Sequence, residues 1–121
     1  MDASSVARLI ALGRVGLGAG FVAAPGLVAR LWVGEGGTGA RVLGAGFGAR
    51  DVAIGAGLWH ALEHDRDTHT WLLAGAAGDV ADGLATLAAR NSLPLVGRVG
   101  VAAFAATGAG LSLWAARQLA P

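Results

Sequence analysis

The sequence predicts an all-α fold, in the form of a four-helix bundle that spans a membrane. Hydrophobic residues make up 55% of the chain and charged residues only 14%, whereas a soluble domain usually carries about 25% charged residues. Four long apolar segments alternate with short polar or glycine-rich connections. All four tryptophans lie near the ends of these segments, where a membrane–water interface would half bury each ring and keep its N–H wet.

Length and composition limit the classes of function. A chain of 121 residues is expected to form one domain. The nine basic residues are all arginine, are scattered along the chain and leave a formal net charge of only +1, so no nucleic-acid partner is expected. Cysteine is absent, which excludes disulfides, thiolate metal ligands and cysteine nucleophiles.

The composition is typical of a bacterial integral membrane protein. Arginine without lysine, together with abundant Ala, Gly and Val, indicates a high-GC bacterial genome. The stretch Met1–Ser5 lacks the basic n-region of a signal peptide, so we expect the first apolar segment to be retained as an anchor. We therefore expect a multi-pass protein of the bacterial cytoplasmic (inner) membrane, with the lipid bilayer as a partner.

Local signals indicate where each helix begins and ends. Ser4 or Ser5 can cap the first helix, and Pro25 is expected to kink or end it because proline lacks a backbone N–H. The densely charged connection between the second and third segments is expected to be a solvated turn, in which Asp67 or Thr68 caps the next helix. The segments expected to span the membrane are residues 6–32, 40–62, 70–89 and 95–119.

Glycines at helical spacing predict close packing between helices. Gly16 and Gly20 form a small-xxx-small pair in the first segment, which would let another helix approach closely. In the third segment, Gly75 and Gly83 flank Asp79 at four residues on either side. Two adjacent faces of the second segment carry Gly44, Gly48, Asp51 and Gly55 on one and Gly46, Arg50 and Gly57 on the other.

Five charged residues lie within the apolar segments instead of at their ends: Arg14, Arg50, Asp51, Asp79 and Asp82. An unpaired charge at the centre of a bilayer costs at least about 2.5–3.5 kcal/mol, so we expect the five to form one buried polar cluster. The expected ion pairs join Arg50 to Asp79 or Asp82, and Arg14 to Asp51. Because three carboxylates face two guanidinium groups, one carboxylate is expected to carry a proton.

No catalytic residue, metal site or cofactor is predicted. The chain has no recognisable nucleophile–base pair and no cofactor motif. His60 and His64 are four residues apart beside Glu63, an arrangement that could bind a divalent metal. Their spacing matches no zinc signature, so a solvated loop is the favoured interpretation.

Two short stretches carry a resemblance to a known family. They are Gly-Ala-Arg-Asp-Val-Ala-Ile-Gly at 48–55 and Gly-Asp-Val-Ala-Asp-Gly at 78–83. Through them the chain resembles small bacterial four-helix membrane proteins of the DoxX-like kind, and an uncharacterised actinobacterial family of similar length. The resemblance implies a four-helix bundle. DoxX proteins are associated with membrane oxidoreductase systems, which implies an accessory role by analogy.

Two functions remain open for the charged cluster. As an interhelical clamp, it would fix the packing of a non-catalytic accessory or scaffold subunit that forms a homo-oligomer or joins a larger membrane complex. As a polar pocket, it would bind or transport a small molecule such as a lipid headgroup, a quinone or a proton-coupled substrate. Arg50 would then contact an anionic or carbonyl group, and Asp79 or Asp82 would handle a proton.

Overall fold

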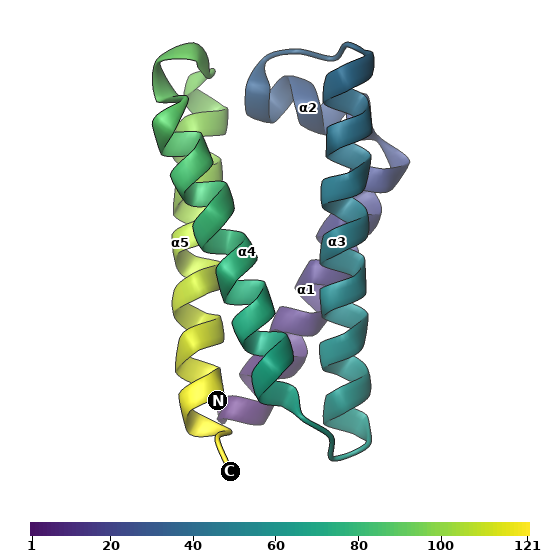
Figure 1. Ribbon diagram of the computed structural model, residues 1–121, viewed down its shortest axis with the longest axis vertical. Coiled ribbons are helices and arrows are strands. Elements are labelled where there is room, and N and C mark those ends of the chain that lie inside the picture. The colour runs from purple at the N-terminus through teal and green to yellow at the C-terminus, as the bar shows by residue number, and fades with distance from the viewer.

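The computed structural model describes residues 1–121, and all of its regular elements are helical, as the sequence predicts (Figure 1). The four long helices run along the long axis of the molecule, the short α2 lies at one end, and both termini lie at the other (Figure 1). The elements are α1 (Ala3–Ala23), α2 (Pro25–Val33), α3 (Thr38–Glu63), α4 (Thr68–Ala88), a 3-10 turn (Arg90–Ser92) and α5 (Leu95–Gln118).

The first predicted segment, residues 6–32, is divided into two helices. Helix α1 ends at Ala23, and α2 begins with Pro25 in its first turn, where the missing proline N–H costs no helical hydrogen bond. Helix α2 ends at Val33 and is followed by Gly34, whose φ of 81° is the left-handed conformation that favours glycine at this position. The prediction that Pro25 kinks or ends the first helix is therefore confirmed, because the chain turns at the proline and continues as a second, short helix.

The helix caps match the sequence predictions in one case of two. The prediction that Ser4 or Ser5 caps α1 is wrong, because both already lie within the helix and the cap is Asp2, which accepts a hydrogen bond from the Ser5 N–H at 2.8 Å. Helix α4 is capped by Asp67, one of the two candidates, which accepts from the backbone N–H of Thr70 at 3.1 Å. The Thr70 hydroxyl and N–H hold the pKa of the Asp67 carboxyl below its usual value.

Helices α1 and α3 form a closely packed pair in which glycines bring the two backbones together. A Cβ atom at Gly18 would lie 2.4 Å from the carbonyl oxygen of Gly48, and one at Gly48 would lie 2.5 Å from that of Gly18. A Cβ atom at Gly55 would lie 2.7 Å from the carbonyl oxygen of Ala11. On α1, the glycine at the close contact with α3 is Gly18. At Gly16 and Gly20, the predicted packing pair, a Cβ atom would meet no atom within 4 Å.

Helices α4 and α5 form the second pair, and the two pairs diverge toward the end where α2 lies (Figure 1). They converge near the termini, where the buried hydrophobic core lies. This core draws on α1, α3, α4 and α5, and its residues are small except for two leucines. The core comprises Ala7, Ala11, Leu58, Leu72, Ala115 and Ala116.

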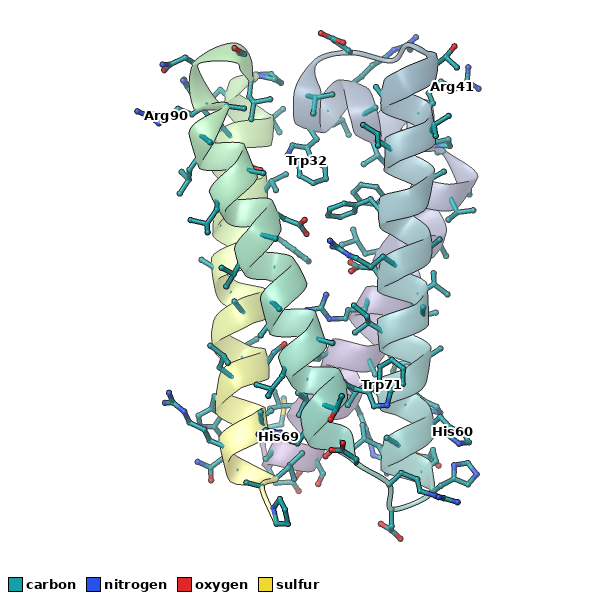
Figure 2. All side chains as sticks on the ribbon, viewed as in Figure 1. Trp32, Arg41, His60, His69, Trp71 and Arg90 are labelled. Carbon is teal, nitrogen blue, oxygen red and sulfur yellow. The ribbon has the colours of Figure 1, made fainter.

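The outer surface of the four long helices is apolar. Only 22 of the 121 residues are buried, and exposed large hydrophobic side chains occur on every helix. Apart from the five central charges, every charged residue lies in a connection or within two turns of a helix end. Figure 2 shows Arg41 and Arg90 at one end of the molecule, and His60 and His69 at the other.

Two helices, α1 and α5, are long and apolar enough to cross a membrane by length and composition. Only 22% of the most apolar 18-residue window of each is buried. Helices α3 and α4, which carry four of the five central charges, do not meet the same criterion.

Candidate functional site

The structure brings together the five charged residues that the sequence singles out. Arg14 projects from α1 and bridges two other helices. Its Nη2 donates to Asp79 Oδ2 of α4 at 2.5 Å, and its Nη1 donates to Asp51 Oδ1 of α3 at 3.3 Å. The Arg14–Asp51 contact is one of the pairs expected from the sequence, and the shorter contact to Asp79 is an addition to them.

Arg50 of α3 forms a two-pronged ion pair with Asp82 of α4. Its Nη1 lies 3.1 Å from Asp82 Oδ1 and its Nη2 lies 2.7 Å from Asp82 Oδ2, a geometry that suits the planar guanidinium. The same Nη2 lies 3.4 Å from Asp51 Oδ1. Of the two partners expected for Arg50, the structure pairs it with Asp82, and its Nε is buried without a hydrogen-bond partner.

These contacts make one continuous chain of alternating charge, Asp79–Arg14–Asp51–Arg50–Asp82. Its two parts differ in burial: the side chains of Arg14 and Asp51 are 8% and 5% exposed, whereas that of Arg50 is 34% exposed. Two guanidinium groups balance two of the three carboxylates. With all three ionised, the cluster carries one negative charge in excess.

Glycines make room for this cluster. A Cβ atom at Gly75 would lie 2.8 Å from Arg14 Nη2, and one at Gly108 of α5 would lie 2.6 Å from Asp79 Oδ2. The sequence predicted that Gly75 and Gly83, on either side of Asp79, let a neighbouring helix pack closely. In the structure Gly75 faces the Arg14 guanidinium, and Gly83 faces Ala105 of α5 at 3.4 Å.

A cavity of about 720 Å³ lies between the two helix pairs. Arg14, Asp51, Asp79 and Asp82 are its charged residues, and the rest of the lining is mostly apolar residues of α1, α2 and α5 together with Phe47 of α3. We call this space the groove. The groove can therefore offer an apolar surface and a charged cluster to the same molecule. Its apolar walls include Leu9, Leu17, Val101, Phe104 and Leu111.

Three aromatic rings form the end of the groove nearest α2. The ring centroids of Phe21 and Phe47 are 5.3 Å apart, and those of Trp32 and Phe47 are 4.7 Å apart. Trp32 Nε1 donates to the Thr86 hydroxyl of α4 at 3.1 Å. At this end α2 also abuts α5, since a Cβ atom at Gly97 would overlap the Trp32 carbonyl oxygen at 1.9 Å.

This aromatic end was not predicted from the sequence. Trp32 was expected at the membrane interface with a wet N–H, but its N–H is bound to Thr86 and its ring lines the groove (Figure 2). One signal was present: Phe47 precedes Arg50 by three residues, so the two share a helix face. The Arg50 guanidinium carbon lies 4.1 Å from the Phe47 ring centroid.

The histidines at the other end are part of a helix terminus. The rings of His60 and His64 have centroids 4.2 Å apart, and His64 Nδ1 lies 2.9 Å from the His60 carbonyl oxygen. No group of three or more histidine, aspartate or glutamate side chains is arranged to hold a metal ion.

No family model matches the chain, and no curated protein or solved structure matches it either. The resemblance to DoxX-like proteins therefore stays a prediction.

Proposed function

We propose that this chain is a bacterial inner-membrane protein that crosses the bilayer with α1, α3, α4 and α5, and that it binds an amphiphilic small molecule in the groove. The observation that carries the proposal is the pairing, in one cavity, of extended apolar walls with the Arg14–Asp79 end of an ion-pair cluster.

The surface of the molecule supports four membrane spans. The long helices have 21 to 26 residues, or about 31–39 Å at about 1.5 Å per residue, and the hydrocarbon core is about 30 Å thick. The core helix of a soluble protein would be mostly buried, whereas α1 and α5 are mostly exposed. The charges of α3 and α4 turn inward and pair, which offsets the cost that keeps charges out of lipid.

The dimensions of the groove support a small-molecule ligand. Binding sites for small molecules are commonly about 300–1,000 Å³, mostly apolar, with a few placed polar groups. The groove has about 720 Å³ and four charged residues among apolar neighbours. A lipid, a quinone or a proton-coupled substrate would lay its apolar part along α1 and α5 and its polar part at Arg14 and Asp79.

The experiment that tests this uses two matched substitutions on α5. Gly100 lines the groove and has no atom within 4 Å of its Cβ position, so Gly100→Phe fills the groove without a clash. Gly110 also has open space but does not line the groove, so Gly110→Phe is the control.

Each protein is extracted in mild detergent and analysed by native mass spectrometry. We expect a bound small molecule on the wild type and on Gly110→Phe, and none on Gly100→Phe. The same bound molecules on all three proteins would overturn the groove as the site. Recovery of the wild type in the soluble fraction without detergent would overturn the membrane assignment.

A second candidate function is the non-catalytic accessory or scaffold subunit. Gly16 and Gly20 of α1 favour it, because no atom lies within 4 Å of either Cβ position. Outward-facing small residues at this spacing commonly let a second transmembrane helix approach. A homo-oligomer or a stoichiometric protein partner that is retained by the wild type and lost from Gly16→Leu would support this candidate. If Gly16→Leu retained that assembly, the Gly16 and Gly20 surface would not be the interface, and the accessory-subunit candidate would lose its support.

A further inference from the structure

We propose that the ligand of the groove is an organic cation: a single positive charge on an apolar, partly aromatic body. This inference rests on the proposed function, since it assumes a ligand in the groove and adds its charge and class. It comes from the charge balance of the cluster together with the rings that line the same cavity.

With all three carboxylates ionised, the five charges of the cluster are short of one cation, and without a ligand the proton predicted on one carboxylate would take that place. Asp82 is balanced by Arg50 through two hydrogen bonds. Arg14 is then shared by Asp51 and Asp79. Both of these carboxylates are buried, and a buried charge without a full partner is costly in an apolar medium.

No other element supplies the missing positive charge. Helices α2 and α5 line the groove with uncharged residues only. Arg50 does not line the groove, so its free Nε does not face a ligand there. Met1 lines the groove too, but it is 87% exposed and lies at the rim.

An anionic ligand fits the groove poorly. Both terminal nitrogens of Arg14 already donate to carboxylates, so an incoming anion would have to displace Asp51 or Asp79. It would also raise the excess of negative charge from one to two. A cation placed beside the same carboxylates brings the cluster to neutrality.

The aromatic end of the groove indicates an organic cation, not a metal ion. The faces of aromatic rings attract cations, and Phe21 and Trp32 line the groove beside Phe47, whose ring already has the Arg50 guanidinium over it. A metal ion would need several ligating side chains around one point, and no such group of three or more is present. A cavity of about 720 Å³ with apolar walls instead fits a bulky body.

The test compares two ions of nearly the same size and shape but opposite charge. Tetraphenylphosphonium and tetraphenylborate are titrated against the protein in lipid nanodiscs, with empty nanodiscs subtracted, and triphenylphosphine oxide serves as the neutral analogue. We expect saturable binding of tetraphenylphosphonium to the wild type, at least about tenfold weaker binding of the other two probes, and loss of binding in Gly100→Phe.

Two isosteric Asp→Asn variants test whether the excess negative charge of the cluster is what binds the cation. Asp79→Asn removes the excess charge from the groove and is expected to weaken tetraphenylphosphonium binding by about tenfold or more. Asp65→Asn makes the same chemical change in the exposed connection after α3, at a residue that does not line the groove, and is expected to bind as the wild type does. If Asp79→Asn does not fold, the comparison of the three probes on the wild type still decides the question.

The outcomes separate this inference from the function on which it rests. If the neutral or the anionic probe binds as tightly as the cation and is lost in Gly100→Phe, the groove is a binding site but the cation preference is wrong. Equal binding of tetraphenylphosphonium to Asp79→Asn and the wild type would likewise overturn the preference. If no probe shows binding that depends on Gly100, the groove itself fails as the site.

Discussion

The contact between α1 and α3 and the contact between the two helix pairs are built in opposite ways. In the first, backbone meets backbone, and glycines such as Gly18 and Gly48 leave no room for a side chain. In the second, beyond the hydrophobic core near the termini, side chains reach across a gap, through Arg14–Asp79, Arg50–Asp82 and Trp32–Thr86. The first contact leaves no space for a Cβ atom at these glycines, whereas the second holds a cavity of about 720 Å³.

This difference gives the two contacts different structural roles. A backbone contact is fixed by sterics, so it has one geometry and cannot open by degrees. A contact made by a few long side chains leaves volume between them and can admit a bound small molecule. The α1–α3 pair therefore serves as a rigid wall, and the polar bridges hold the α4–α5 pair at a distance from it.

The largest expected effect comes from breaking the polar bridge at its centre. Arg14→Gln leaves Asp51 and Asp79 without their shared partner, and both are buried. Removing one member of a buried ion pair costs about 3–5 kcal/mol, so we expect a loss of that size in the free energy of unfolding, measured by denaturant titration in detergent.

The double variant Arg14→Gln with Asp79→Asn tests the cause of that loss. It removes one charge of each sign and leaves no additional unpaired carboxylate, so it is expected to be more stable than Arg14→Gln alone. If the double variant is less stable than the single one, unpaired charge is not what Arg14 prevents.

The second prediction concerns the glycine contact. Gly48→Leu would drive a side chain into Gly18 O and Phe21 Cβ, both at 2.5 Å from the Cβ position, and overpacking of this kind costs about 1–3 kcal/mol. Gly16→Leu on the partner helix meets no atom within 4 Å and should leave the thermal unfolding midpoint near that of the wild type. Equal losses in the two variants would mean that helix propensity, not close approach, explains the glycines.

The two contacts also differ in how well the sequence predicts them. The charged residues in the contact between the two helix pairs were predictable, because a charge within an apolar segment must turn inward and pair. This requirement identified Arg14, Arg50 and Asp79 together with their neighbours. The backbone contact was predictable on α3, where Gly48 and Gly55 share a face with Asp51, but the α1 partner was misplaced. Gly16, Gly18 and Gly20 occur in one short run, and spacing alone does not decide between them.

The apolar walls of the groove could not be predicted, for a physical reason. In the membrane location that we propose, a leucine or phenylalanine suits lipid and cavity equally well, so its identity does not show which it faces. Phe104 is 64% exposed and yet lines the groove. The place of Trp32 depends on the turn at Pro25, which directs α2 back over the helix pairs and turns an expected interface residue inward.

The smallest expected effect lies outside both contacts, at the start of α4. The carboxylate of Asp67 accepts hydrogen bonds from the Thr70 hydroxyl and N–H, which lower its pKa below the ordinary value of 3.8. Because the folded pKa is the lower one, the cap stabilises the folded chain above about pH 4 and stops doing so as the pH falls through the lowered value. Asp67→Ala should therefore lower the thermal unfolding midpoint slightly at pH 7, with the difference from the wild type shrinking in acid.

Asp67→Asn is the matched control, because asparagine is as good an N-cap as aspartate but does not titrate in this range. It should stay close to the wild type at pH 7 and show no loss of its capping effect in acid. A loss from Asp67→Ala as large as that from Gly48→Leu would show that the start of α4, which neither contact includes, stabilises the bundle as much as the α1–α3 wall does. A loss from Asp67→Ala that is independent of pH would mean that the carboxylate charge plays no part in the cap.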